Sequence, residues 1–319
     1  MDLFQAALNN DTAKIKEYLK FGNVNVVDDH HSSLLHYATR GNAMEVATLL
    51  LDNYINLNIV NDSGQTPLFE AVSRGQLGFC KVLCRYHADS KIVNNANETI
   101  YFKAILKGRM DILELLEDNL DIDYEFVNDN GENALFYALK AYNNDLFIDL
   151  ANSYPNLIKQ RNFHNVSLLM LAIKYDNMVI FDYLIDKFDN YYECDKEYNN
   201  VLFYAARYGS VEMIIKLLKT NPIINGKNKN NETIFDLASQ NIHPTLHILE
   251  NYKDSYEYKL YKRTYPFHIA VIERNYDLLD YGLSYINKKD ANGISLLEYI
   301  YKLDDQIIFD IFKLKRQFQ

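Results

Sequence analysis

The side chains that could carry acid–base chemistry in this chain are two pairs of carboxylates. Asp28 with Asp29 and Asp121 with Asp123 have the residue types needed for a general acid and a general base. Both pairs lie in segments rich in turn-forming residues, where aspartate commonly accepts hydrogen bonds from its own backbone. A hydrolase would need these carboxylates to face a closed cleft, so we interpret both pairs as solvated turns.

Histidines and cysteines supply the candidate metal ligands. His243 and His247 are spaced i, i+4 and could bind a metal ion on one helix face, but no cysteine or glutamate stands at ligand spacing beside them. Cys80, Cys84 and His87 resemble a soft-metal set, yet both cysteines occupy apolar positions of a helical pattern. The chain also lacks the phosphate-binding glycine motifs. We therefore predict no metal ion, no cofactor and no catalytic residue.

The elements that position these side chains are clearest between residues 66 and 75. Thr66 can cap a helix, Pro67 suits the first helical position, and Gly75 allows the left-handed turn that ends the helix. A second apolar run at residues 79–84 also has helical spacing. The unit is therefore a turn, a short helix, a second turn and a longer helix.

This unit recurs along the chain with a period near 33 residues, marked by one small residue of the first helix. The register residues are Ala6, Ala38, Ala71, Ala104, Ala138, Ala172, Ala205, Ala238, Ala270 and Ile300. Together with the stretch Thr66-Pro67-Leu68-Phe69-Glu70-Ala71, this period resembles the ankyrin repeat family. The resemblance implies a mainly α fold, an ankyrin-repeat α-solenoid of about ten repeats with short β-hairpin or loop fingers between the helix pairs. It also implies that His36 and His268 brace the neighbouring hairpins by hydrogen bonds.

Because a solenoid adds units instead of enlarging one core, we expect residues 1–319 to form a single ankyrin-repeat domain. Tyr142 and Asp176 replace the turn glycine in units five and six, at some cost in backbone freedom. Residues 241–263 depart from the repeat pattern, and we expect an irregular joint there.

The composition predicts a cytoplasmic chain, including one delivered to or expressed in the cytosol of a host cell. Three cysteines do not make a disulfide framework and favour a reducing compartment. The N-terminus has no signal-peptide pattern, and no apolar run reaches the ~18 residues of a membrane span. We expect no membrane contact and a monomer in the free state.

One charge pattern goes beyond maintenance of the fold. Units two to seven each carry a cation two or three residues after the register alanine, and tyrosines lie beside them. The cations are Arg40, Arg74, Lys107, Lys140, Lys174 and Arg207, and the tyrosines are Tyr37, Tyr137, Tyr175, Tyr204 and Tyr208. Arginine and tyrosine often anchor protein interfaces, although cations near a helix C-terminus are also favoured by the helix dipole alone. The resemblance implies that first helices line the concave face, so these residues are the candidate partner-binding site.

Two classes of binding function follow. The first is a non-catalytic protein–protein interaction module, acting as scaffold, inhibitor or targeting protein, which includes a pathogen or viral factor directed at a host. In a chain with a net charge of −10, a positive strip indicates a protein partner with an acidic surface. The alternative is a nucleic-acid-binding repeat protein, which the acidic total charge disfavours. We do not expect an enzyme, because the repeats leave no room for a catalytic domain.

Overall fold

The computed structural model describes residues 2–119, 122–187, 193–220, 224–253, 255–279, 282–290, 293–303 and 305–313. These residues form two compact units, residues 1–157 and residues 158–319. We describe each unit by itself. That the whole chain behaves as one domain stays a prediction.

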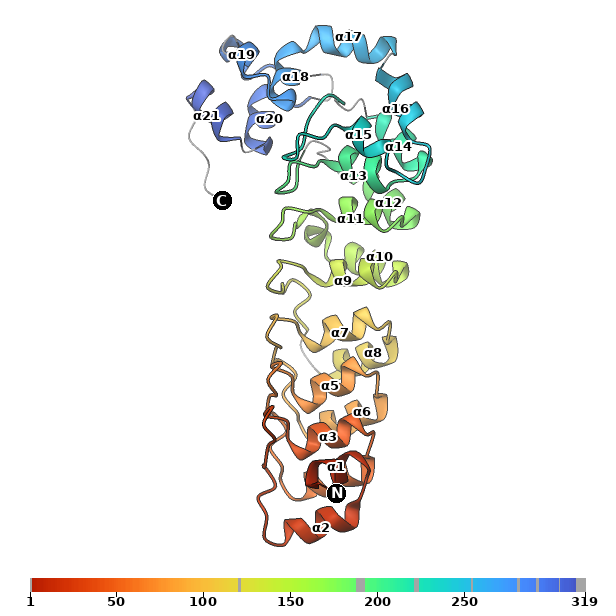
Figure 1. Cartoon of the computed structure of the whole chain (residues 1–319), viewed down its shortest axis with the longest axis vertical. Helices are drawn as coiled ribbons and strands as arrows, with labels where there is room; N and C mark the ends of the chain where they lie inside the picture. Colours follow the sequence, from red (N-terminus) through yellow and green to blue (C-terminus); the bar gives the residue numbers. More distant parts are fainter. Residues whose placement is uncertain are drawn as a thin grey trace. The chain divides into compact units, whose positions relative to one another are not determined.

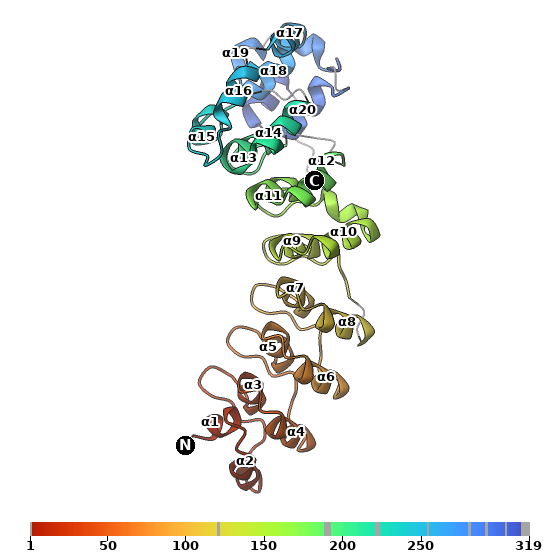
Figure 2. The same cartoon turned by 90° about the vertical axis from the view of Figure 1, so that its right-hand side faces the viewer.

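The first unit consists of helix pairs in which a short first helix is followed by a longer second helix (Figure 1). The helices are α1 (Leu3–Leu8), α2 (Thr12–Leu19), α3 (Leu34–Arg40), α4 (Met44–Asp52), α5 (Pro67–Ser73), α6 (Leu77–Arg85), α7 (Ile100–Leu106), α8 (Met110–Asn119), α9 (Ala134–Lys140) and α10 (Asn144–Ser153), and the 3-10 helix η1 (Pro155–Lys159) follows them. Successive first helices pack against each other, from α1 through α3, α5 and α7 to α9. Figure 2 shows these first helices along one side of the unit and the second helices along the other.

The second unit begins with the same arrangement and then changes. Its helices are α11 (Leu168–Lys174), α12 (Met178–Ile185), α13 (Val201–Tyr208), α14 (Val211–Leu218), α15 (Ile234–Ala238), α16 (Leu246–Lys253), α17 (Tyr256–Thr264), α18 (Pro266–Glu273), α19 (Tyr276–Leu279), η2 (Leu283–Tyr285), α20 (Leu296–Leu303) and α21 (Gln306–Phe312). First helices α11, α13 and α15 pack in series, and α18 packs against α20. Within the described residues, ten helix pairs thus match the ten register positions of the sequence.

Most first helices begin at a residue whose side chain accepts a hydrogen bond from the second or third N–H group of the helix, whereas the N-caps of α1 and α18 make no such bond. Ser33 caps α3, Thr66 caps α5 and Asn133 caps α9 through their side-chain oxygens. Such caps satisfy backbone donors that a short helix otherwise leaves open. The nine register alanines are at most 3 % exposed, and Ile300 is fully buried, so the small residue marks where neighbouring first helices meet.

The connections before the first helices are loops built on one repeated hydrogen-bonding scheme. An Asp or Asn accepts, through Oδ1, the N–H groups two and four residues later, as Asn94 does from Ala96 and Glu98. The same loop closes with a bond from the Asn94 N–H to the Glu98 carbonyl. We call these five-residue loops fingers, and they span residues 28–32, 61–65, 94–98, 128–132, 162–166, 195–199 and 228–232.

Adjacent fingers within each unit are joined by main-chain hydrogen bonds. The Asp62 N–H donates to the His30 carbonyl at 3.1 Å, and the Asn95 N–H donates to Ser63 at the same distance. Strand pairing in the described residues is limited to isolated bridges, such as Val27 with Ser33. The fingers are therefore stacked loops, and extended β-hairpins are not formed in this part of the chain.

Two turns hold bulky residues in a left-handed conformation. Tyr142 and Asp176 have φ angles of 54° and 51°, at the positions where Gly75 and Gly108 have 68° and 63°. A residue with a Cβ atom costs about 1–2 kcal/mol in this region. The sequence interpretation of these two positions agrees with the backbone.

The repeat pattern is interrupted between α15 and α18. Helix α16 begins only at Leu246, after the Pro244 segment, and helix α17 occupies the place where the other repeats have a finger. The described residues of this stretch are thus helical instead of a finger loop. No helix in the described chain combines the length and the apolar character needed to cross a membrane.

Candidate functional site

The six predicted cations all lie at the C-terminal ends of first helices. Four of them belong to the first unit, and two, Lys174 on α11 and Arg207 on α13, belong to the second. We call the six residues the first-helix row: Arg40, Arg74, Lys107, Lys140, Lys174 and Arg207. That all six line one groove stays a prediction.

The six cations of the row fall into two groups according to their distance in sequence from the register alanine. Arg40, Lys140 and Arg207 stand two residues after their alanines, and each forms an ion pair with a glutamate. Arg74 and Lys107 stand three residues after theirs, and both are exposed without an ion pair in the described residues. One further helical position turns the side chain by about 100°, away from the fingers.

Arg40 shows how a cation of the row is held. Its Nε lies 3.0 Å from Oε2 of Glu70, and its Nη2 donates to Glu70 Oε1 at 2.6 Å and to Ser32 Oγ at 2.9 Å. The guanidinium also lies 5.0 Å from the centre of the Tyr37 ring. Glu70 is only 7 % exposed and accepts a further bond from Asn61 at 2.9 Å. Burial lowers the pKa of Arg40, but the bonds and charge of Glu70 more than reverse this effect.

The other two pairs use the last residue of a finger. Lys140 Nζ binds both oxygens of Glu132 at 2.7 and 2.6 Å, and Glu132 is almost fully buried. Arg207 lies 3.5 Å from Glu232. These cations neutralise carboxylates inside the protein, so they are less available to a partner than the sequence pattern indicated.

Lys174 stands at the paired position but remains exposed. The finger residues that could face it are Val166 and Asn199 instead of glutamate. Its ammonium lies 6.0 Å from the centre of the Tyr208 ring, which is itself 38 % exposed. The exposed members of the row are therefore Arg74, Lys107 and Lys174.

Tyr137 is a buried part of the repeat contacts. It is 3 % exposed, stacks on Phe102 with 4.4 Å between ring centres, and donates to Glu98 Oε1 at 2.7 Å. Burial raises the pKa of Glu98, but bonds from Lys103, Tyr137 and Asn94 outweigh it and lower the pKa overall. A partner therefore cannot reach the Tyr137 ring without rearranging the fold.

The remaining tyrosines of the site differ in accessibility. Tyr37 and Tyr204 are half-buried and donate to the first residues of their own fingers, to Asp28 at 2.7 Å and to Asp195 at 3.0 Å. Tyr175 caps the C-terminus of α11 and is half-buried. Tyr208 is the most exposed of the five. The structure thus brings Tyr208 and Lys174 together as an accessible pair.

His36 and His268 brace neighbouring segments, as the resemblance implied. His36 accepts from the Ser33 N–H at Nδ1, at 3.0 Å, and its Nε2 lies 2.9 Å from the Gln65 carbonyl of the next repeat. His268 makes the corresponding Nε2 contact with the Lys288 carbonyl at 2.9 Å. Protonation of Nδ1 would remove the bond from Ser33 to His36, so the geometry gives His36 a bracing role.

We expect the free energy of unfolding to fall as the pH drops below about 6.5, the ordinary pKa of histidine. Burial lowers the pKa of His36 in the folded state. The unfolded chain then binds more protons, so this stabilisation is complete above about pH 6.5 and decreases below it, by at most about 1.4 kcal/mol per pH unit. Urea unfolding at pH 7.0 and 5.5 measures the loss. Between these two pH values, the free energy of unfolding of a His36→Gln variant should fall by less than that of the unmodified protein. An equal fall would contradict the prediction.

The other chemical candidates have structural roles. Asp28 and Asp123 accept backbone N–H bonds in turns, whereas Asp121 lies outside the described residues. Burial raises the pKa of the Cys80 thiol to about 12, so it is a poor nucleophile and a poor metal ligand at neutral pH. His243 lies before α16, so it does not share a helix face with His247.

Sequence reasoning missed the acidic partners of the row. Glu132 and Glu232 each end a finger, four residues after its Asn, and Glu98, which pairs with Lys103 outside the row, ends another finger in the same way. The Asx residues recur with nearly the same period as the alanines, from Asp28 to Asn228. That second periodic series was the signal that could have identified the fingers and their carboxylates.

Comparison with known proteins agrees with this architecture. A family model described as ankyrin repeats (3 copies) matches residues 3–94 and 169–255, which is more than half of the chain. The chain belongs to the ankyrin repeat family, and the predicted fold class is confirmed. Members of this family generally bind other proteins and are generally non-catalytic.

One curated relative is an alpha-latroinsectotoxin, Lt1a, from Latrodectus tredecimguttatus. It is 25 % identical to this chain over 145 residues, which are 44 % of this chain. The matched segment spans about a tenth of that protein's length. The similarity therefore concerns a stretch of repeats.

Proposed function

We propose that this chain is a non-catalytic binding protein, a scaffold, inhibitor or targeting protein, that recognises an acidic protein surface with its first-helix row. The proposal rests on the difference between the cations of the row that form ion pairs and those that remain exposed. Arg74 and Lys107 occupy adjacent repeats, are exposed, and have no carboxylate partner in the described residues. Cations that the fold does not neutralise are available to an acidic partner.

The paired members of the row support the exposed ones. Arg40 and Lys140 hold the ends of α3 and α9 against neighbouring carboxylates, so these two helix ends are restrained before a partner binds. A rigid surface loses little conformational entropy on binding. In the second unit, Tyr208 offers an aromatic face beside Lys174, a combination common at interfaces.

The proposal also includes the cellular location of the chain and its state when no partner is bound. We place the chain in a cytoplasm, as a monomer when free, and include action on a host protein among its roles. The printed name of the spider relative describes a toxin, but only a tenth of that protein is matched. The partner is therefore assigned by charge and not by this relative.

We expect the double variant Arg74→Glu/Lys107→Glu to weaken binding of the partner by at least about tenfold. Like charges would then face each other across the interface, which slows association and can cost several kcal/mol. Folding should be unaffected, because exposed charges usually change stability by about 0.5 kcal/mol or less. The measurement is affinity capture from the native cell followed by mass spectrometry, and then titration of the captured partner at two salt concentrations.

The matched control is Lys81→Glu/Arg85→Glu on the second helix α6. Both side chains are exposed, and the change in net charge is the same. If the two variants weakened binding of the partner equally, long-range charge alone would explain the effect. That outcome would contradict a role for the row. Binding of single-stranded or duplex DNA that is lost only with the row variant would instead favour the nucleic-acid alternative.

A further inference from the structure

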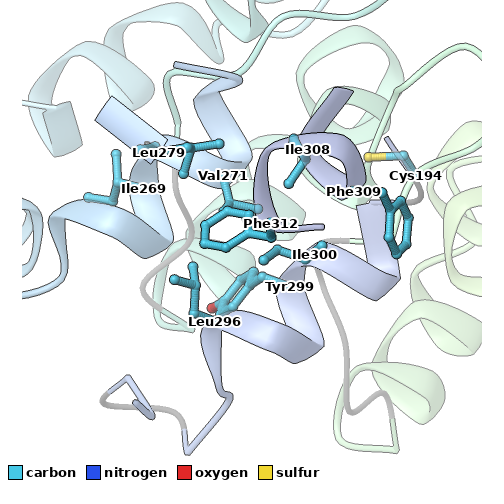
Figure 3. Close-up of a cluster of buried hydrophobic side chains, with 11 residues drawn as sticks. Cys194, Ile269, Val271, Leu279, Leu296, Tyr299, Ile300, Ile308, Phe309 and Phe312 are labelled. Carbon is cyan, nitrogen blue, oxygen red and sulfur yellow. The ribbon is translucent and has the colours of Figure 1, made fainter. Parts of the chain in front are cut away.

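The last helix pairs of the second unit pack against a finger as well as against each other. Their core contains residues of α18, α20 and α21, including Val271, Ile300 and Phe309. Cys194, which directly precedes the finger at residues 195–199, is buried in the same cluster (Figure 3). Apolar side chains of the C-terminal repeats therefore cover the base of a finger more than seventy residues earlier in the sequence.

Arg274 forms the polar part of this contact. Its guanidinium lies 4.0 Å from the centre of the Tyr198 ring in that finger, and one terminal nitrogen donates to the Lys227 carbonyl at 3.4 Å. Its Nε binds Asp305 Oδ2 at 2.9 Å, and Asp305 is the N-cap of α21. One arginine thus connects two finger regions with both of the last two helix pairs.

The backbone at this contact is strained. Arg274 has a φ angle of 52° and stands four residues after the register alanine, where Gly75 and Gly108 make the same left-handed turn without a side chain and Tyr142 and Asp176 make it with one. Tyr198 also has a positive φ of 63°. Left-handed side chains cost about 1–2 kcal/mol each, and such strain is usually found where the side chain serves a specific contact.

The connection to these repeats differs from every other connection in the described chain. Helix α17 replaces a finger, so no finger joins the repeat of α15 to the repeat of α18. Neighbouring repeats normally stabilise each other through continuous stacking. Here the contact with the earlier fingers takes the place of that stacking.

We infer that the fingers at residues 195–199 and 228–232 form a protein-binding surface, and that the C-terminal repeats, Pro266–Phe312, bind it within the same chain as a displaceable partner. The surface fits an apolar helix pair that carries an arginine at a helix end. An external protein with these features would compete with the C-terminal repeats. Arg207 of the first-helix row touches this surface through Glu232, but the row is tested at Arg74 and Lys107, which lie in the first unit, so this proposal and the proposed function can fail independently.

The test uses Cys194 as a reporter of docking in the full chain. Burial raises the pKa of this thiol to about 12, so it reacts slowly with a maleimide while it is covered. Arg274→Gly removes the ring and carbonyl contacts together with the ion pair to Asp305, and it relieves the left-handed strain, so the turn itself remains favourable. We expect labelling of Cys194, followed by peptide mass spectrometry, to be about tenfold faster in this variant, as expected for the loss of a cation–π contact and a charged hydrogen bond.

Two internal comparisons separate undocking from unfolding. Cys80 is buried in the first unit and should keep its rate, and Tyr142→Gly, a similar change at a left-handed turn elsewhere, should leave Cys194 slow. Hydrogen exchange should show faster exchange at residues 195–199 with α13 still protected. An unchanged Cys194 rate in Arg274→Gly, or loss of protection in α13 together with the finger, would overturn the inference.

Discussion

Replacing Gly41 by alanine is expected to lower the free energy of unfolding by about 3 kcal/mol, at the upper end of the range for overpacking. Gly41 has an ordinary φ of −84°, so conformational freedom is not the reason. A Cβ atom at this position would lie 1.8 Å from the Leu8 carbonyl oxygen of the neighbouring repeat. Because that atom belongs to the backbone, α1 would have to move away from α3.

The comparison variant is Gly108→Ala. Gly108 has a φ of 63°, but a Cβ atom there would meet nothing within 4 Å. We expect this change to cost only about 1 kcal/mol, the cost of a left-handed alanine. Urea unfolding followed by far-UV circular dichroism measures both variants. If Gly108→Ala were as harmful as Gly41→Ala, close approach of the repeats would not be the dominant effect.

Glu70→Ala is expected to lower the free energy of unfolding by about 2 kcal/mol. Removing one partner of a buried ion pair typically costs about 3–5 kcal/mol, and solvent access to Arg40, which is 26 % exposed, reduces this cost. The change also leaves Asn61 without its acceptor. Equilibrium urea unfolding of the single variants gives the individual losses.

A double-mutant cycle tests whether this loss comes from the pair. Arg40→Ala/Glu70→Ala removes both charges, so its loss should be smaller than the sum of the single losses by about 1 kcal/mol or more. Additivity within about 0.3 kcal/mol would mean that the two side chains act independently. The pair would then not be what fixes the end of α3.

The fold was largely predictable because it is encoded redundantly. The register alanines, the caps such as Thr66, and the turn residues each occur once per repeat, so errors at one position are corrected by the others. The left-handed turns at Tyr142 and Asp176 were identified from register alone, although a tyrosine is unusual in that conformation and an aspartate adopts it more easily.

The site was less predictable because it depends on side-chain direction. The sequence grouped Arg74 with Arg40, but one residue of offset places the first in solvent and the second against Glu70. The periodic positions in the sequence also give no sign that Cys194 contacts the C-terminal repeats, since that contact is not between neighbouring repeats. Only contacts between adjacent repeats follow from a period.

Helix α17 has a mechanical consequence. In a regular stack, a pulling force applied at one end must break the same helix-to-helix contact at every repeat. Here, tension at the C-terminus would first act on the contacts of Arg274 and on the cluster around Cys194. Helix α17 could then unfold and lengthen the connection without disturbing α15. Under tension, the C-terminal repeats would thus detach first, before the force separates the stacked repeats of the second unit.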